Sequence, residues 1–343
     1  HLLNKNITIA GLGWLGKSFA VHLKNLGYSV KGSVTDSSKA NELKRQGIAT
    51  FPIVLNEGGV SGEVDTFLAN TDVLTIMIPP GLRRNTGANY ALKMAHFLHE
   101  IERSSVEKVI LISSTSVYDD EQGVVTEKDV PKPMTNAAKQ LFDVEQIFFN
   151  TTAFKTSIVR FGGLFGGSRN PVRFLAGRTD LRNGDAPVNM IHREDCIGIL
   201  QAIIEQDAFG HIFNAVAPQH PTKKAYYTEQ AKQLELIPPE YTSEKEAAYK
   251  QVDSELISSV LKYSFKVHKF HILIWYKQLI FCSVIFLYLR GSFIAITLKY
   301  DSMQTSCRQR LTTFYEYCVS KTEYEMLRMT NFGKKSLKCE FLT

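Results

Sequence analysis

Three glycines near the start of the chain have the spacing of a phosphate-binding turn. Gly11, Gly13 and Gly16 lie in the stretch GLGWLG, which follows an apolar run and opens a run with helical periodicity. In such a turn the first glycine permits a tight bend, the second lets the backbone approach a pyrophosphate, and the third lets helix and strand pack closely. Amide groups at the helix start favour an anion. The pattern predicts a dinucleotide-binding turn, and a tight turn without a ligand is the alternative.

The end of the predicted second strand bears on which dinucleotide would bind. An NAD site of this kind usually has Asp or Glu there, to hold the ribose hydroxyls. The stretch YSVKGSVTD instead places Val34 and Thr35 at this point, and Asp36 comes late, where it would cap the next helix. Residues that could accommodate a 2′-phosphate are Ser33, Thr35, Ser37 and Lys39. The sequence therefore favours NADP over NAD.

Strand and helix patterns alternate through residues 1–165 and would position this turn. The predicted strands are 6–12, 28–34, 72–80, 106–115 and 155–165. The predicted helices are 14–27, 37–47, 89–104 and 135–149. Such alternation predicts an α/β fold with a doubly wound parallel sheet, the Rossmann fold, with right-handed crossovers.

Residues 166–265 have a looser pattern. Strands are expected at 187–192 and 211–217, and helices at 195–206 and 223–235. Loops that gather over the carboxyl ends of a parallel sheet usually form its substrate side. We therefore expect 166–265 to be the smaller, substrate-facing part of the same unit.

Charge and composition separate the last part of the chain from the rest. The whole chain has a net charge of +6, but residues 256–343 carry 13 Lys and Arg against 5 Asp and Glu. The remainder is near neutral, which argues against a nucleic-acid surface there. Four of the five cysteines follow residue 255 at spacings that match no metal-ligand pattern. These cysteines are therefore expected to be free thiols in a reducing cytosol, and we expect a cytoplasmic location. A strand pattern begins almost at once, so we expect no signal peptide.

Further motifs resemble a known superfamily. LISSTSVYDD (111–120) resembles the SSTSVYG signature of extended short-chain dehydrogenases/reductases, which include nucleotide-sugar epimerases and dehydratases. IVRFGGLFGGSRNPVRFLAGR, VNMIHREDCIGIL and GHIFNAVAPQHP resemble an atypical bacterial branch of NAD(P)-binding, epimerase-like proteins. The resemblance covers about residues 5–265. It implies an NAD(P)-dependent oxidoreductase or epimerase-like enzyme for a small molecule or sugar nucleotide.

The resemblance also implies which residues contact the cofactor. The matching positions are the glycine loop with Trp14 and Leu15, the segment Ile78, Pro79 and Pro80, the strand end at Ser113, and the turn of Arg160, Phe161 and Gly162. Ser114 and Thr115 match the place of the superfamily's catalytic Ser or Thr.

The superfamily's usual proton donor is missing. Full enzymes carry a Tyr-x-x-x-Lys pair in which the lysine holds the ribose and lowers the tyrosine pKa from about 10. Lys139 could be this lysine or a solvated helix residue, but Thr135 stands four residues before it. Alignment on Glu145 instead gives Ala137 and Leu141. Ordinary dehydrogenase chemistry is therefore in doubt, and a non-catalytic dinucleotide-binding or redox-sensing protein is the alternative.

Two other side chains could handle the proton. Tyr118 lies three residues past Thr115, where it could face the cleft or pack beneath a substrate loop. His192 could titrate near neutrality or hydrogen-bond a loop. Asp195 is the expected N-cap of the helix that follows. No metal cluster is indicated.

Residues 266–343 form an atypical basic and apolar tail. Residues 270–289 are largely apolar, but the uninterrupted run from Leu279 has only 11 residues, fewer than the 18 expected for a membrane span. A marginal membrane anchor is one hypothesis. Read-through or a frameshift is the other, and the loss of Pro and Gly favours it.

Overall fold

The computed structural model describes residues 5–81, 87–242 and 249–267 with their side chains. The chain divides into two compact units, His1–His268 and Lys269–Thr343. Of the second unit only the backbone of four strands is described, paired antiparallel as β14 with β15 and β16 with β17. Their bounds are β14 (Ile285–Leu289), β15 (Ser292–Ile296), β16 (Arg328–Phe332) and β17 (Ser336–Glu340).

Within the described residues, seven parallel strands form the central sheet of the first unit, in the order β12-β9-β7-β6-β1-β2-β3. Their bounds are β1 (Asn6–Ala10), β2 (Ser29–Val34), β3 (Ala49–Pro52), β6 (Val73–Ile76), β7 (Lys108–Ser114), β9 (Lys155–Phe161) and β12 (Ile212–Ala215). The predicted doubly wound parallel sheet is confirmed. The strand order reverses between β1 and β6, and ligands of such sheets bind outside the carboxyl ends at this point.

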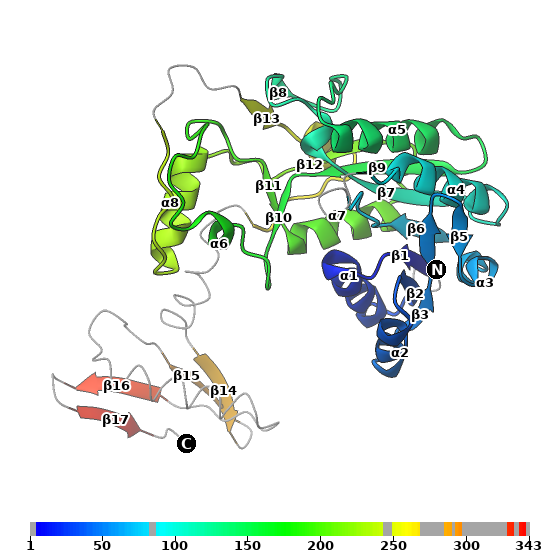
Figure 1. Ribbon diagram of the computed structural model, residues 1–343. Helices are drawn as coiled ribbons and strands as arrows, with labels where there is room; N and C mark the ends of the chain where they lie inside the picture. Colours follow the sequence, from blue (N-terminus) through cyan, green and yellow to red (C-terminus); the bar gives the residue numbers. More distant parts are fainter. Residues whose placement is uncertain are drawn as a thin grey trace. The chain divides into compact units, whose positions relative to one another are not determined.

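Helices cover both faces of the sheet (Figure 1). One apolar cluster joins β1 and β12 to α1 and α7, and a second joins β6 and β7 to α4 and α5. The helices are α1 (Trp14–Asn25), α2 (Ser37–Arg45), α3 (Val64–Leu68), α4 (Tyr90–Glu102), α5 (Asn136–Asn150) and α7 (Arg193–Glu205). Because both faces are covered, residues 7–10 of β1 and all of β6 are buried without alternation, including the polar side chains of Thr8 and Thr75.

The predicted strand 155–165 is broken in two. β9 ends at Phe161, and β10 (Gly163–Phe165) leaves the sheet to pair with β11 (Met190–His192). The bend occurs at Gly162, where a Cβ atom would lie 2.7 Å from the carbonyl oxygen of Asn189. The sheet therefore ends at Phe161, and the following residues pass over its carboxyl edge. The predicted strand 72–80 likewise ends early, at Ile76.

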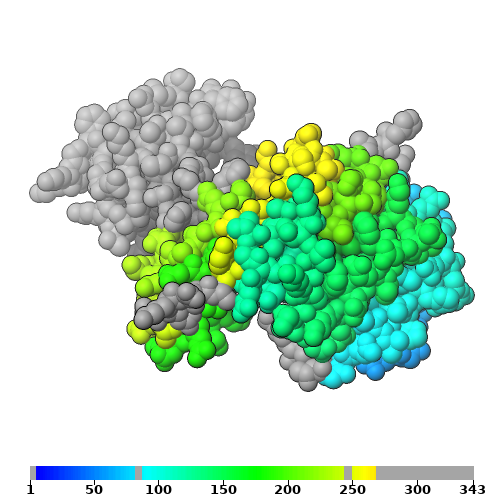
Figure 2. Space-filling view, turned by 90° about the horizontal axis from the view of Figure 1, so that it is seen from above, coloured from blue at the N-terminus to red at the C-terminus, as the bar shows by residue number. Residues whose placement is uncertain are grey.

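The edge strand β3 and several short elements were not predicted, because their apolar runs are too short. These are α3, the hairpin of β4 (Val54–Asn56) and β5 (Gly59–Ser61), the 3₁₀ turn η2 (Thr115–Val117), β8 (Gly123–Val125), α6 (Val172–Leu175), β13 (Lys250–Val252) and α9 (Glu255–Ser259). α8 (Lys223–Gln233) was expected. β13 pairs with β8, and in Figure 2 the yellow atoms near residue 250 lie against the teal atoms of the β8 region.

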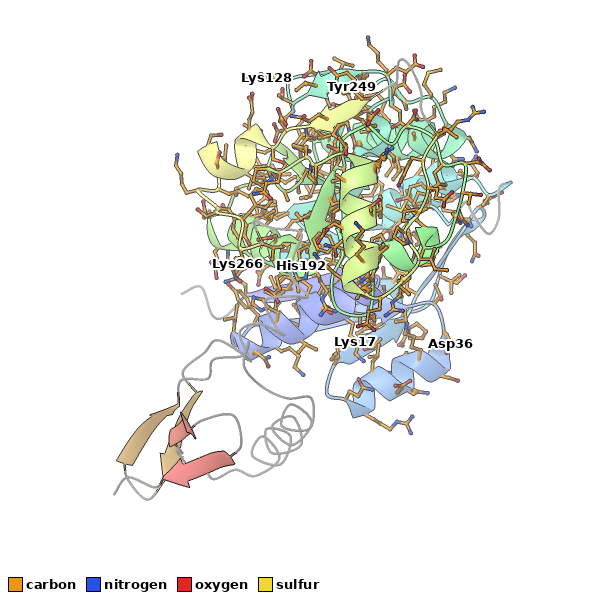
Figure 3. The ribbon with its side chains drawn as sticks, turned by 90° about the vertical axis from the view of Figure 1, so that its left-hand side faces the viewer. Lys17, Asp36, Lys128, His192, Tyr249 and Lys266 are labelled. Carbon is orange, nitrogen blue, oxygen red and sulfur yellow. The ribbon has the colours of Figure 1, made fainter. Side chains whose placement is uncertain are left out.

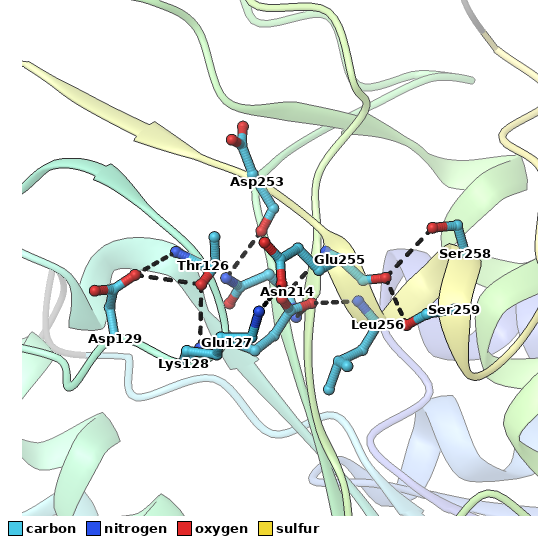
Figure 4. A network of polar contacts seen from close by, with 10 residues as sticks. All are labelled: Thr126, Glu127, Lys128, Asp129, Asn214, Asp253, Glu255, Leu256, Ser258 and Ser259. Atoms are coloured by element: carbon cyan, nitrogen blue, oxygen red, sulfur yellow. Dashed lines mark hydrogen bonds and ion pairs between the residues drawn. The ribbon is translucent and has the colours of Figure 1, made fainter.

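Glu127 ties the β8 region to two distant segments (Figure 4). Its carboxylate accepts hydrogen bonds from the backbone amides of Asn214, Glu255 and Leu256 at 3.1–3.2 Å. Burial raises the pKa of Glu127. One side chain thus anchors the start of α9 to β12, which fixes the last described part of the first unit.

The prediction that Asp195 caps α7 is wrong. The N-cap is His192, whose Nδ1 accepts a hydrogen bond from the Glu194 amide, because the helix starts two residues earlier than expected. Asp195 is fully buried and accepts from the Tyr263 hydroxyl at 2.8 Å and the Lys266 amide at 2.7 Å. The carboxylate therefore holds the end of the first unit.

No helix in the described part of the chain is long and apolar enough to cross a membrane. Of the apolar stretch 270–289, residues 270–284 lie outside the described residues, and 285–289 form β14.

Candidate functional site

The glycine loop joins β1 to α1 as the sequence predicts, and packing accounts for two of its glycines. Gly11 has φ +105°, and a Cβ atom there would lie 2.8 Å from the carbonyl oxygen of Met77. A Cβ atom on Gly16 would collide with the carbonyl oxygen of Gly11. These two glycines are needed by the turn whether or not a ligand binds.

Gly13 is different, since no packing requirement explains it. Apart from its two chain neighbours, no described residue has an atom within 4 Å of a Cβ atom built on Gly13, and its φ of −79° is open to any residue. It is the N-cap of α1, yet it has no side chain to cap the helix, and the first turn contains no acidic residue. The backbone amides at this end are therefore suited to an anion that approaches closely.

The end of β2 lies beside this loop. The Ser33 hydroxyl accepts a hydrogen bond from the Gly11 amide at 3.1 Å, so Ser33 supports the loop. Thr35 and Lys39 are exposed. Asp36 caps α2 as predicted, with its carboxylate accepting from the Lys39 amide at 2.8 Å. Figure 3 marks Asp36 at the start of α2 and Lys17 in α1.

The segment after β6 lies on the other side of the loop. Ile78 is half-buried, and its Cγ1 atom would lie 3.6 Å from a Cβ atom on Gly11. Its carbonyl oxygen accepts from the Tyr90 hydroxyl at 2.9 Å. Pro79 and Pro80 follow directly. The structure thus brings this predicted segment and the glycine loop together at the switch point of the sheet.

A cavity of about 570 Å³ lies over the carboxyl ends of β7 and β9. Its wall includes the predicted residues Ser113, Ser114, Thr115, Phe161 and Gly162. Three cationic side chains, which the sequence did not single out, also line it: Arg169, Lys223 and Lys250. Among the described residues of the lining, Asp120 is the one carboxylate, and it lies 2.9 Å from the Lys250 ammonium. The described lining therefore has a net positive charge and suits an anionic molecule.

Two serine hydroxyls in this wall have different hydrogen-bonding roles. Ser113 donates its proton to the buried carboxylate of Glu145 at 2.6 Å, so it can only accept a further hydrogen bond. The Ser114 hydroxyl accepts from the Ser116 amide at 3.1 Å and keeps its own proton to donate. Ser114 is thus the better placed of the two to donate to a substrate.

Tyr118 and Arg160 lie beneath the cavity, in a buried network. The Tyr118 side chain is 1% exposed, and its hydroxyl accepts from Arg160 at 2.8 Å and lies 3.0 Å from the amide oxygen of Asn214. Arg160 pairs with Glu145 through two nitrogens, the shorter contact being 2.6 Å. Burial raises the pKa of Tyr118. Neither Tyr118 nor Arg160 lines the cavity, so both are placed to support it.

His192 is also placed away from the cavity wall. Its ring is buried as the N-cap of α7 and packs edge-on against Phe165, with ring centroids 5.1 Å apart. Burial lowers its pKa, which favours the neutral ring. Figure 3 marks its position. The geometry gives His192 a role in loop structure rather than in contact with a substrate.

Helix α5, where the resemblance would place a Tyr-Lys pair, contributes no residue to the cavity wall among the described residues. Thr135 is its N-cap, and Lys139 is exposed. Leu141 is buried in the apolar cluster of β6 and β7. The structure therefore does not bring Lys139 together with Ser114 and Thr115.

Comparison with known proteins agrees with this architecture. No family model matches the chain. Protein YeeZ of Escherichia coli (strain K12) is 32% identical over 266 residues, which cover 76% of this chain and 96% of that protein. The structure of UDP-glucose 4-epimerase from Thermotoga maritima, with UDP-glucose, has a TM-score of 0.65 and 16% identity, over 80% of this chain and 98% of that one.

Two further solved structures hold NAD. MoeE5 with UDP-glucuronic acid and NAD has a TM-score of 0.62 and 17% identity, over 76% of this chain and 94% of that one. The structure of UDP-glucuronic acid 4-epimerase from Bacillus cereus, with NAD, has a TM-score of 0.63 and 18% identity, over 76% of this chain and 92% of that one. The chain thus shares the fold of these NAD-binding and nucleotide-sugar enzymes.

Proposed function

Since the chain belongs to the family of Escherichia coli YeeZ, we propose that it binds a nicotinamide dinucleotide at the glycine loop and transforms an anionic small molecule in the adjoining cavity. The observation that carries this proposal is the open space over Gly13 at the uncapped start of α1. A glycine that packing does not require is expected where a pyrophosphate approaches the backbone.

The chemistry proposed is an oxidoreductase or epimerase-like reaction. The bound dinucleotide supplies hydride transfer. Structural relatives that hold NAD together with a UDP sugar support this reading. The residues of this chain that would hold the cofactor are the glycine loop with Trp14 and Leu15, the segment Ile78–Pro80, and the wall at Ser113, Phe161 and Gly162.

The substrate class follows from the cavity charges. Lys223 faces no carboxylate within ion-pair distance among the described residues, whereas Lys250 is paired with Asp120. Guanidinium and ammonium groups bind phosphate oxygens through charge-assisted hydrogen bonds. We therefore infer a phosphate-bearing substrate such as a sugar nucleotide, the class that the structural relatives hold.

Within this proposal the cofactor is NADP rather than NAD. Asp36 is engaged as the cap of α2, and the exposed Thr35 and Lys39 lie beside it. A carboxylate that already accepts a backbone hydrogen bond is less available to the ribose hydroxyls, and a lysine favours a 2′-phosphate.

Replacing Lys39 with Glu should lower the affinity for NADP by about tenfold more than that for NAD. The reason is that the variant carboxylate repels the 2′-phosphate, whereas it can accept from a ribose hydroxyl. Calorimetric titration with both dinucleotides measures the difference. Lys44→Glu makes the same charge change in the last turn of α2 and serves as the control. An equal loss for NADP and NAD at Lys39→Glu would remove the assignment.

Ser114 is proposed to donate a hydrogen bond, or a proton, to the reacting group. Ser114→Ala should lower kcat by about 10²–10⁴-fold and leave dinucleotide affinity unchanged. The assay follows turnover of a panel of nucleoside-diphosphate sugars. Ser116→Ala is the control, because Ser116 also lines the cavity and its side chain is exposed. Equal turnover by the Ser114 and Ser116 variants would exclude the role given to Ser114.

A second function is a dinucleotide-binding protein without turnover. The observation that favours it is that α5 gives the cavity no side chain within the described structure, so the usual Tyr-Lys pair has no counterpart there. Dinucleotide binding without conversion of any nucleoside-diphosphate sugar would support this second function over the first.

A further inference from the structure

Two arginines from distant parts of the chain meet at the glycine loop. The guanidinium carbons of Arg169 and Arg193 each lie 5.4 Å from the centroid of the Trp14 ring. Trp14 is the first residue of α1 and follows Gly13 directly. Guanidinium groups are attracted to the face of an indole ring, which can hold them in place. Little hydration energy is lost, because a guanidinium is weakly hydrated.

The loop after β10 brings both arginines into position. Gly166 and Arg169 exchange two backbone hydrogen bonds, at 2.9 and 3.1 Å, which close a tight turn. Gly167 has φ +56°, and a Cβ atom on it would lie 2.7 Å from Nη1 of Arg193. Gly167 thus leaves room for the Arg193 guanidinium, and the tight turn places Arg169 against Trp14.

Neither arginine forms an ion pair with a described residue. Within the described ranges neither Arg169 nor Arg193 lies within 4 Å of a carboxylate oxygen. Asp195, two residues from Arg193, is turned to Tyr263 and Lys266, and Glu194 is exposed. Lys17 lies in the first turn of α1, at the end where the helix dipole is positive and cations are disfavoured. The start of α1 is therefore strongly electropositive.

We propose that Arg169 and Arg193 are binding residues for the diphosphate of the dinucleotide, and that Trp14 positions them. This inference rests on the proposed function. A diphosphate at the start of α1 would relieve the repulsion between the clustered cations. Its oxygens would also accept paired hydrogen bonds from the planar guanidinium groups, whose N–H donors match the spacing of phosphate oxygens. Since Arg169 also lines the cavity, it would mark the border between the dinucleotide and the substrate.

The test compares ligands with and without a diphosphate. The full chain and its Arg169→Gln, Arg193→Gln and double variants are titrated with ADP-ribose and with adenosine. Each single change should lower the affinity for ADP-ribose about 10–100-fold, as expected for the loss of a charge-assisted hydrogen bond. The affinity for adenosine should be unchanged. Arg173→Gln, at an exposed position in α6, makes the same charge change and should have no effect.

The outcomes separate this inference from the proposed function. If the unaltered chain binds neither ADP-ribose nor any nicotinamide dinucleotide, both are overturned. If it binds them and the arginine variants bind ADP-ribose equally well, only this inference is overturned. The same holds if adenosine binding falls as much as ADP-ribose binding, because the loss would then not concern the diphosphate.

Tryptophan fluorescence provides a second readout. The chain has two tryptophans, Trp14 and Trp275, so Trp275→Phe makes Trp14 the single emitter. Inorganic pyrophosphate should change the Trp14 emission in this background, and the change should be lost in the double arginine variant. A pyrophosphate response that survives without both arginines would overturn their role.

Discussion

Arg160→Met is expected to lower the free energy of unfolding by about 3–5 kcal/mol, because it leaves a buried carboxylate unpaired. Arg160 and Glu145 are 2% and 0% exposed and share three hydrogen bonds. The change also removes the donor to the Tyr118 hydroxyl. Denaturant unfolding followed by circular dichroism measures the loss.

Lys108→Met provides the matched control, since Lys108 pairs with Asp207 at a solvent-accessible position. Loss of such an exposed pair is expected to cost less than about 1 kcal/mol. The double variant Glu145→Leu/Arg160→Met should be more stable than Arg160→Met alone, because no buried charge then lacks a partner. If Arg160→Met lowers the free energy of unfolding no more than Lys108→Met does, the buried network does not have the stabilising role given to it.

Gly13→Asp is expected to weaken dinucleotide binding without lowering the stability of the fold. Aspartate is a better N-cap than glycine by about 0.3 kcal/mol, and its negative charge suits the start of a helix. The stability of the fold should therefore be unchanged or slightly raised. The same carboxylate would occupy the space of the pyrophosphate. The affinity for the dinucleotide should therefore fall at least about 100-fold through repulsion between like charges.

Gly58→Asp is the control, because Gly58 also has open space around a Cβ atom and lies in the turn between β4 and β5, away from the loop. Calorimetric titration and thermal unfolding of both variants make the comparison. If Gly13→Asp binds the dinucleotide like the unaltered chain, the glycine loop is not the binding site. If it fails to fold, the space over Gly13 does not admit a side chain.

The sheet and the glycine loop were predictable because both depend on local sequence. Apolar runs alternating with helical periodicity specify a parallel sheet, and the spacing of Gly11, Gly13 and Gly16 specifies the turn after β1. The cap at Asp36 is local as well, since a side chain there bonds an amide three residues on. Features of this kind can be recognised without knowledge of distant contacts.

The features that were not predictable depend on distant partners. Nothing near Tyr118 indicates that its hydroxyl would meet Arg160 and Asn214 beneath the cavity. Asp195 has the position of a cap, but its partners lie about 70 residues away, at Tyr263 and Lys266. The side chains of Arg169, Lys223 and Lys250 converge on the cavity from three segments with no shared motif.

Calorimetric titration of the full chain with NADP, NADPH, NAD and NADH decides whether the glycine loop binds a dinucleotide. We expect micromolar binding of one oxidised and reduced pair, with NADP and NADPH preferred. Binding of none of the four would contradict this expectation, since GLGWLG would then be a structural turn, and both the enzyme and the non-catalytic dinucleotide-binding protein would have to be abandoned.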